Sequence, residues 1–159
     1  SSVDLVNFYT SHEALLLDYE KAFVEHHMNK KYCCSANMLW VGDRTRNVNA
    51  EHIKFVSDLE NPIGIKIGPS INIDDLCKIY DQVNPHHQKG KLSFIVRLGA
   101  RNIENMLPKI INKINYYGHK VLWLCDPMHG NTIKAKNGYK TRKFESTLRL
   151  ETQKKNSCS

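Results

Sequence analysis

Short apolar runs recur in this sequence, and a cationic side chain lies at or just after the end of three of them. Arg44 closely follows one such run, and Lys66 and Arg97 lie near the ends of the next two. Arginine offers a planar fork of donors to carboxylate or phosphate, and lysine offers a point charge. The three residues together indicate a binding site for a small substrate that carries phosphate and carboxylate groups.

A histidine follows the fourth apolar run, within Asp126-Pro127-Met128-His129-Gly130-Asn131. Taken singly, each candidate has an ordinary structural role: His129 as a hydrogen-bonded loop residue, Lys66 extended to a sheet edge, Arg97 paired with a buried carboxylate. Arg44 alone is typical of a surface loop. Only their recurrence at equivalent positions favours a shared site.

The four apolar runs predict β-strands, because each is short, rich in branched residues and bounded by Gly, Pro or polar residues. Between them, apolar residues recur at helical spacing. Near-continuous apolar strands that alternate with helices are typical of a parallel sheet in an α/β protein. In such folds, ligands bind beyond the carboxyl ends of the strands. The predicted strands are 38–41, 62–69, 92–98 and 121–125.

The segment before the first predicted strand has a different pattern. Thr10 and Glu13 have the spacing of a capping box, and Leu15, Tyr19 and Phe23 recur at helical spacing. This pattern predicts a helix over residues 12–26.

The composition excludes several classes of protein. No apolar run approaches the roughly 20 residues of a membrane-spanning helix, so we expect no membrane partner. The five cysteines are odd in number and include no C-x-x-C pair, which excludes a zinc ribbon and a disulfide framework. The 23 basic and 16 acidic residues give a net charge of +7, which suits anionic small substrates and leaves a nucleic-acid binder as an alternative. Neither the dinucleotide fingerprint nor the P-loop motif occurs.

Several long blocks resemble the class II (plant-type) DAHP synthases, in order and with the spacing of that family, from about Asp4 to Glu145. The blocks that carry the resemblance are Tyr9–Glu20, Met38–Arg46, Asn61–Pro69, Ile95–Ala100, Cys125–Thr132 and Asn137–Arg142.

The resemblance implies a (β/α)₈ TIM barrel that condenses phosphoenolpyruvate with erythrose 4-phosphate, the first step of the shikimate pathway to the aromatic amino acids. It also implies a divalent metal, Mn²⁺ or Co²⁺, a homo-oligomer, and no nucleic-acid partner. The compartment implied is the cytoplasm, or the plastid in a plant.

The resemblance also implies roles for individual residues. Arg44, Lys66 and Arg97 match the cations that bind phosphoenolpyruvate, and His129 matches a metal ligand. Asp43 stands where the family commonly has Glu, and its backbone borders the substrate pocket. The remaining matches are Trp40, at the border of that pocket, and Lys140, Thr141 and Arg142, near the active site or the aldose phosphate.

We expect the chain to be a fragment of such an enzyme. A barrel needs about 250 residues, whereas residues 1–147 carry about four βα units of a partial barrel and residues 148–159 diverge, as after a frameshift or truncation. The other metal ligands of the family, a cysteine from an earlier segment and two carboxylates from later strands, have no match here. We therefore expect little synthase activity from this chain alone. The alternative is a non-catalytic α/β domain that binds an anionic phosphorylated metabolite.

Overall fold

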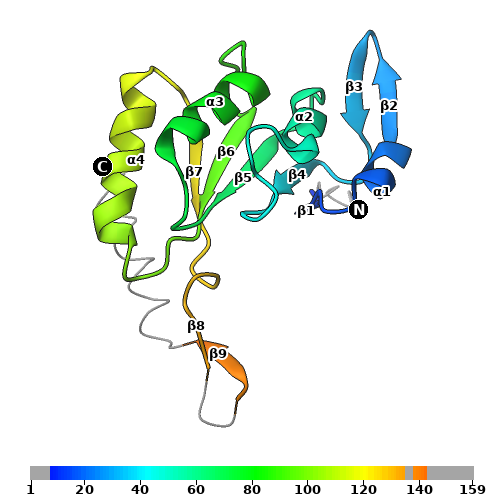
Figure 1. The fold of residues 1–159 in the computed structure, drawn as a ribbon. Helices are drawn as coiled ribbons and strands as arrows, with labels where there is room; N and C mark the ends of the chain where they lie inside the picture. Colours follow the sequence, from blue (N-terminus) through cyan, green and yellow to red (C-terminus); the bar gives the residue numbers. More distant parts are fainter. Residues whose placement is uncertain (1–7, 135–137, 143–159) are drawn as a thin grey trace, which may run out of the picture.

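A computed structural model describes residues 8–134 and 138–142 (Figure 1). Its centre is a five-stranded sheet in the order β1-β4-β5-β6-β7, in which every neighbouring pair is parallel. Two hairpins, β2–β3 and β8–β9, lie outside this sheet. The strands are β1 Ser11–Glu13, β2 Val24–His27, β3 Lys30–Cys33, β4 Met38–Val41, β5 Ile63–Ile67, β6 Leu92–Val96, β7 Leu122–Cys125, β8 Thr132–Lys134 and β9 Lys140–Arg142.

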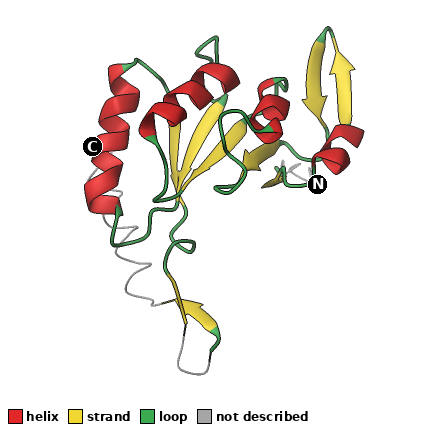
Figure 2. Ribbon diagram, viewed as in Figure 1, coloured by secondary structure: helices red, strands yellow, loops and turns green. Residues whose placement is uncertain are grey.

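Three helices connect the consecutive parallel strands β4 to β7 (Figure 2). Helix α2 packs beside α3, and α3 packs beside α4, so the helices follow the order of the strands. A short helix, α1, precedes the β2–β3 hairpin. The helices are α1 Leu17–Ala22, α2 Glu51–Ser57, α3 Ile73–Val83 and α4 Ile103–Tyr116. The α/β class and the four predicted strands are confirmed.

The helix predicted over residues 12–26 is wrong. Ser11–Glu13 is strand β1, which pairs in parallel with β4, and only Leu17–Ala22 is helical. The chain then turns back through the β2–β3 hairpin, where Met28 and Asn29 have φ values of 47° and 63°. Two consecutive residues with positive φ are typical of a tight hairpin turn.

The capping-box residues have other roles. The backbone N–H and the hydroxyl of Thr10 both donate to the side-chain oxygen of Asn37, at 2.8 and 3.2 Å. The apolar residues that suggested a helix lie at the surface, because Leu15 and Tyr19 are about half exposed. Helical spacing therefore described an exposed face rather than a core-facing one.

The two faces of the sheet differ in composition. Leu39, Ile65 and Phe94 are fully buried and belong to the core cluster with the inner faces of α2, α3 and α4. Side chains alternate along a strand, so the intervening residues, which include Trp40 and Lys66, lie on the opposite face. Charged Lys66 thus lies within an apolar strand without entering the helix-facing core.

Two glycines allow the loops after β6 and β7 to touch. Gly99 and Gly130 have φ values of 74° and 85°, in the left-handed region that favours glycine. A Cβ atom at Gly99 would lie 2.6 Å from the carbonyl oxygen of Gly130, and a Cβ at Gly130 would lie 2.8 Å from that of Arg97. Arg97 and His129 are therefore held near each other by backbone contact.

Membrane-spanning helices and the state of the cysteines can be described for the residues that the structure places. Among residues 8–134 and 138–142, no helix has the length and apolarity needed to cross a membrane. Cys33, Cys34, Cys77 and Cys125 are all free thiols. The predicted divergent tail, 148–159, lies outside the described residues.

Removing buried volume from the central strand tests the core. We expect Ile65→Ala to lower the free energy of unfolding by about 2–5 kcal/mol, because Ile65 is fully buried and its neighbours cannot close the cavity. Urea denaturation followed by circular dichroism measures the loss. Leu16→Ala, at a side chain 69% exposed, is the control and should change stability by less than about 0.5 kcal/mol. Equal losses in the two variants would contradict this packing.

A pair of glycine variants tests the loop contact. Gly99→Ala and Gly118→Ala both place alanine at a positive φ, but a Cβ at Gly118 meets no atom within 4 Å. Each should lose about 1–2 kcal/mol of unfolding free energy from the backbone conformation. Gly99→Ala should lose at least about 1 kcal/mol more, because the loop that contains Gly130 must move. The same denaturation experiment measures both, and identical losses would show that the loops do not touch.

Candidate functional site

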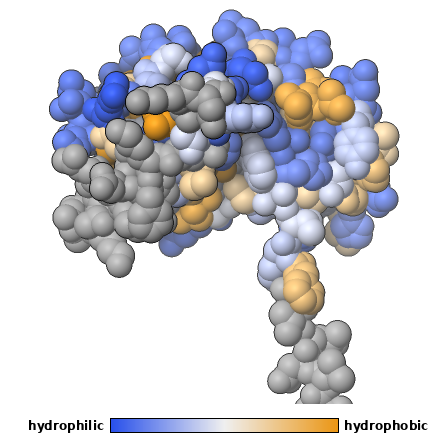
Figure 3. Space-filling model, turned by 90° about the horizontal axis from the view of Figure 1, so that it is seen from below, coloured by the Kyte–Doolittle hydropathy of each residue, from blue (hydrophilic) through white to orange (hydrophobic). Residues whose placement is uncertain are grey.

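A cavity of about 640 Å³ lies at the carboxyl ends of the parallel strands. Its lining includes four cationic side chains, three carboxylates and one histidine. Seen from this end of the sheet, the described surface is mainly hydrophilic, with separate apolar patches (Figure 3). The lining residues are Glu13, Trp40, Gly42, Asp43, Arg44, Lys66, Arg97, Asp126, His129 and Lys140.

Backbone pairing places the functional residues just beyond the strands. The N–H of Arg97 donates to the carbonyl of Ile67, and that of Asp126 donates to the carbonyl of Val96, both at 2.8 Å. The parallel ladder thus continues one residue past β6 and β7. Because all the strands run the same way, these residues meet at one rim.

Asp43 connects three segments at this rim. One carboxylate oxygen accepts from Arg46 Nε and from the backbone N–H of Gly68, both at 2.8 Å. The other accepts from the Arg97 guanidinium at 2.7 Å. A Cβ at Gly68 would collide with the Asp43 carboxylate, so a larger residue there would have to displace that side chain. The Asp43 side chain is thus an internal counter-ion for Arg97, a contact that the sequence does not reveal.

Asp126 plays the equivalent part for Lys66 and His129. One carboxylate oxygen accepts from Lys66 Nζ at 2.6 Å and from His129 Nδ1 at 2.8 Å. The other accepts from the backbone N–H groups of Met128 and His129, at 3.2 and 3.1 Å. Burial alone raises the pKa of Asp126, but the bonds from Lys66 and His129 and the charge of Lys66 outweigh it and bring the pKa to about 2. The carboxylate is therefore ionised at neutral pH.

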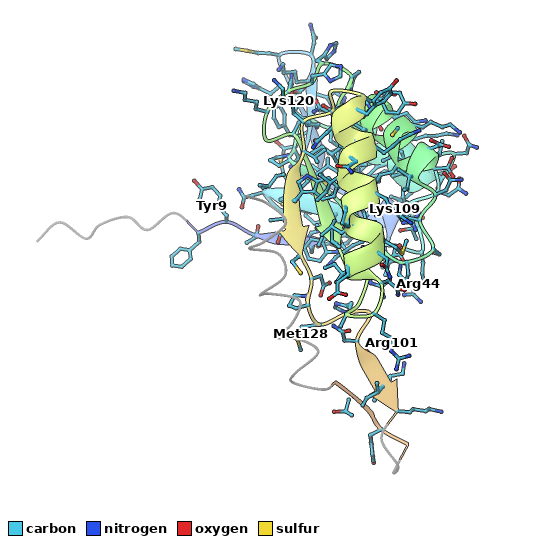
Figure 4. All side chains as sticks on the ribbon, turned by 90° about the vertical axis from the view of Figure 1, so that its left-hand side faces the viewer. Tyr9, Arg44, Arg101, Lys109, Lys120 and Met128 are labelled. Atoms are coloured by element: carbon cyan, nitrogen blue, oxygen red, sulfur yellow. The ribbon has the colours of Figure 1, made fainter. Side chains whose placement is uncertain are left out.

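The other predicted residues differ in how they are held. Lys66 Nζ lies 5.6 Å from the centre of the Trp40 ring, a cation–π contact on the cavity wall. Arg44 is exposed and forms no ion pair with any residue of the described part of the chain. It lies at the same end of the molecule as Met128, opposite Lys120 (Figure 4).

The β8–β9 hairpin brings one further cation to the cavity. Lys140 lines it from β9. Thr141 and Arg142 follow in the same strand, where Arg142 pairs with Thr132 through the backbone. The Arg142 side chain lies outside the described part of the chain. The structure therefore brings together all the other predicted site residues, except that Thr141 does not line the cavity.

The sequence prediction missed Glu13 and Asp126 as site residues. Glu13 ends β1, and its carboxylate lies against Gly42, where a Cβ would collide with it. The sequence prediction assigned Glu13 to a capping box, and its position at the end of a strand is evident only from the pairing of β1 with β4. Asp126 was visible beside His129, but its bond to Lys66, 60 residues away in sequence, exists only in the folded chain.

One nitrogen of this site is suited to a metal ion. Asp126 is an ionised acceptor, so His129 Nδ1 carries a proton, and the neutral ring then presents Nε2 as a lone pair. Within residues 8–134 and 138–142, however, no group of three or more His, Cys, Asp or Glu side chains is arranged to hold a metal ion. The described residues fit a metal site only as contributors to a larger ligand set.

The arrangement favours anion binding. Arg97 and Lys66 each donate one N–H to a carboxylate and have further N–H groups that can bind a ligand. Arg44 and Lys140 also line the cavity, and neither forms an ion pair with a described residue. Cationic donors of this kind, two of them held by carboxylates, suit phosphate and carboxylate groups.

Comparison with known proteins identifies the family of this chain. Residues 1–155 match the family described as the Class-II DAHP synthetase family. The phospho-2-dehydro-3-deoxyheptonate aldolase of Streptomyces coelicolor is 45% identical over 145 residues, which cover 90% of this chain and 32% of that protein. A probable chloroplastic phospho-2-dehydro-3-deoxyheptonate aldolase of Catharanthus roseus is 44% identical over 143 residues, 89% of this chain and 29% of that protein.

A third relative extends the match to another bacterium. The phospho-2-dehydro-3-deoxyheptonate aldolase AroG of Mycolicibacterium smegmatis is 38% identical over 151 residues, 91% of this chain and 32% of that protein. The chain spans about a third of the length of these curated relatives. Because the family match covers nearly the whole chain, the chain belongs to the class-II DAHP synthetase family.

Proposed function

We propose that this chain supplies the phosphoenolpyruvate-binding part of a 3-deoxy-7-phosphoheptulonate synthase, within a (β/α)₈ barrel. The observation that carries the proposal is the meeting of Arg44, Lys66 and Arg97 in one cavity at the ends of consecutive parallel strands. Membership of the family supplies the reaction: phosphoenolpyruvate condenses with erythrose 4-phosphate to give DAHP and phosphate.

The side chains act mainly by holding two anionic substrates together. Arg44, Lys66 and Arg97 bind the phosphate and carboxylate of phosphoenolpyruvate, and Trp40 and the Asp43 backbone border the pocket. Lys140 and Arg142 lie near the phosphate of the aldose. Holding the reacting carbons in contact lowers the entropic barrier, and the fixed cations offset the repulsion between the substrates. The enol carbon of phosphoenolpyruvate joins the aldehyde carbon, water adds to the neighbouring carbon, and phosphate leaves.

A divalent metal, Mn²⁺ or Co²⁺, belongs to this proposal. When bound, it polarises the aldehyde as a Lewis acid. His129 Nε2 is the contribution of this chain to the ligand set. The described residues hold no group of three ligands, and we propose that the other ligands lie outside these residues.

We further propose that the full enzyme is a homo-oligomer, that this chain alone has little activity, and that the protein is located in the cytoplasm or in a plastid. The relative from Catharanthus roseus is named chloroplastic. Family membership does not favour the alternative of a non-catalytic α/β domain.

A thermal melt of the 159-residue chain with phosphoenolpyruvate tests the proposal. A ligand that binds only the folded state stabilises it by about 2.7 kcal/mol at 100 times its Kd. For a chain of this size, we expect the midpoint to rise by roughly 5–10 °C. Arg97→Gln and Lys66→Met should each remove most of this rise, because each removes a positive charge from the cavity.

Lys109→Gln is the matched control. Lys109 is an exposed cation on α4 and does not line the cavity (Figure 4), so the variant loses one charge and should keep the full response. A cooperative melt that does not respond to phosphoenolpyruvate, or equal loss in all three variants, would contradict the anion site. A rise with duplex DNA instead would support the nucleic-acid binder.

A further inference from the structure

We infer that Asp126 is a positioning residue that fixes His129 in the Nδ1–H tautomer and so directs the Nε2 lone pair toward a metal ion, while the same carboxylate oxygen holds Lys66. The role of the lone pair rests on the proposed function, whereas the tautomer follows from the contacts of Asp126 alone.

Within the described part of the chain, the Asp126 carboxylate accepts from four donors. They are Lys66 Nζ, His129 Nδ1 and the backbone N–H groups of Met128 and His129, at 2.6 to 3.2 Å. The side chain is only 10% exposed, so water competes little for these bonds. The two backbone bonds hold the loop directly after β7 against the Asp126 carboxylate. They also restrict the orientation of this carboxylate, independently of its bond to the His129 ring.

This geometry restricts the His129 imidazole to one tautomer, although 60% of the side chain is exposed. A neutral ring has one donor nitrogen and one acceptor nitrogen. With Nδ1 donating to a fixed carboxylate, Nε2 has to be the acceptor. Hydrogen bonds of this type orient metal-ligating histidines and raise their basicity, and their removal commonly costs 10- to 100-fold in metal affinity.

The shared oxygen couples two functions. Lys66 Nζ and His129 Nδ1 both donate to the same oxygen of Asp126. The positions of a substrate-binding cation and of a candidate metal ligand therefore both depend on this one carboxylate. Their contacts with Asp126 are nevertheless separable. Removing Lys66 leaves the bond between Asp126 and His129 in place, whereas removing Asp126 releases both.

Nitrogen NMR of the ¹⁵N-labelled 159-residue chain tests the inference. Long-range correlation spectra distinguish the two tautomers, and the His129 signals are assigned by their loss in His129→Gln. In the unsubstituted chain, we expect Nδ1 to carry the proton. In Asp126→Ala, the ring should shift mainly to the Nε2–H form, which free imidazole side chains prefer. Lys66→Met should keep the Nδ1–H form, and so should Asp58→Ala, which removes an exposed aspartate paired with Lys31.

Titration with Mn²⁺ alone provides the second readout. Paramagnetic broadening of the His129 ring should require about 10- to 100-fold more Mn²⁺ in Asp126→Ala than in the unsubstituted chain. An Nε2–H tautomer in the unsubstituted chain, or equal Mn²⁺ requirements in the two chains, would overturn the inference. Neither readout uses phosphoenolpyruvate, so this failure is distinct from a thermal melt that does not respond to that ligand.

Discussion

The structure depends on pairing between carboxylates and cations at the ends of parallel strands. A partly buried arginine or lysine is costly unless a counter-ion accompanies it. Asp43 accompanies Arg97, and Asp126 accompanies Lys66. Each carboxylate also binds backbone N–H groups of its own or a neighbouring loop. The pairs thus fix the cations, and they also fix the loops that form the cavity.

The paired cations lie at one rim because the sheet is parallel. Each strand delivers its final residue to the same rim, and the row of α2, α3 and α4 supports the strands from one face. The contact between Gly99 and Gly130 then brings the last two loops together. The grouping of cations at this rim is consequently a property of the whole sheet, even though only a few side chains line the cavity.

Much of this arrangement could be predicted from the sequence, since strands β4 to β7 are continuous apolar runs and cations recur at their ends. Strand β1 could not, because Ser11-His12-Glu13 is polar and becomes a strand only by pairing with β4. Because strand β1 was not predicted, Glu13 at its end was not predicted to line the cavity either. The partner of Lys66 could not be predicted either, because Asp126 lies two strands away and the contact depends on tertiary structure. Local pattern thus predicts elements and their ends, whereas ion pairs across strands need the fold.

A ¹H–¹⁵N NMR titration of this chain with phosphoenolpyruvate tests whether a site for this ligand forms at the rim. We predict that shift changes concentrate on the backbone of 42–46, 66–68, 97–99 and 126–131. Changes centred on the groove of about 600 Å³ beside the β2–β3 hairpin, which Lys21, Lys31 and Lys54 line, would contradict a phosphoenolpyruvate site at the rim. So would a spectrum that phosphoenolpyruvate leaves unchanged.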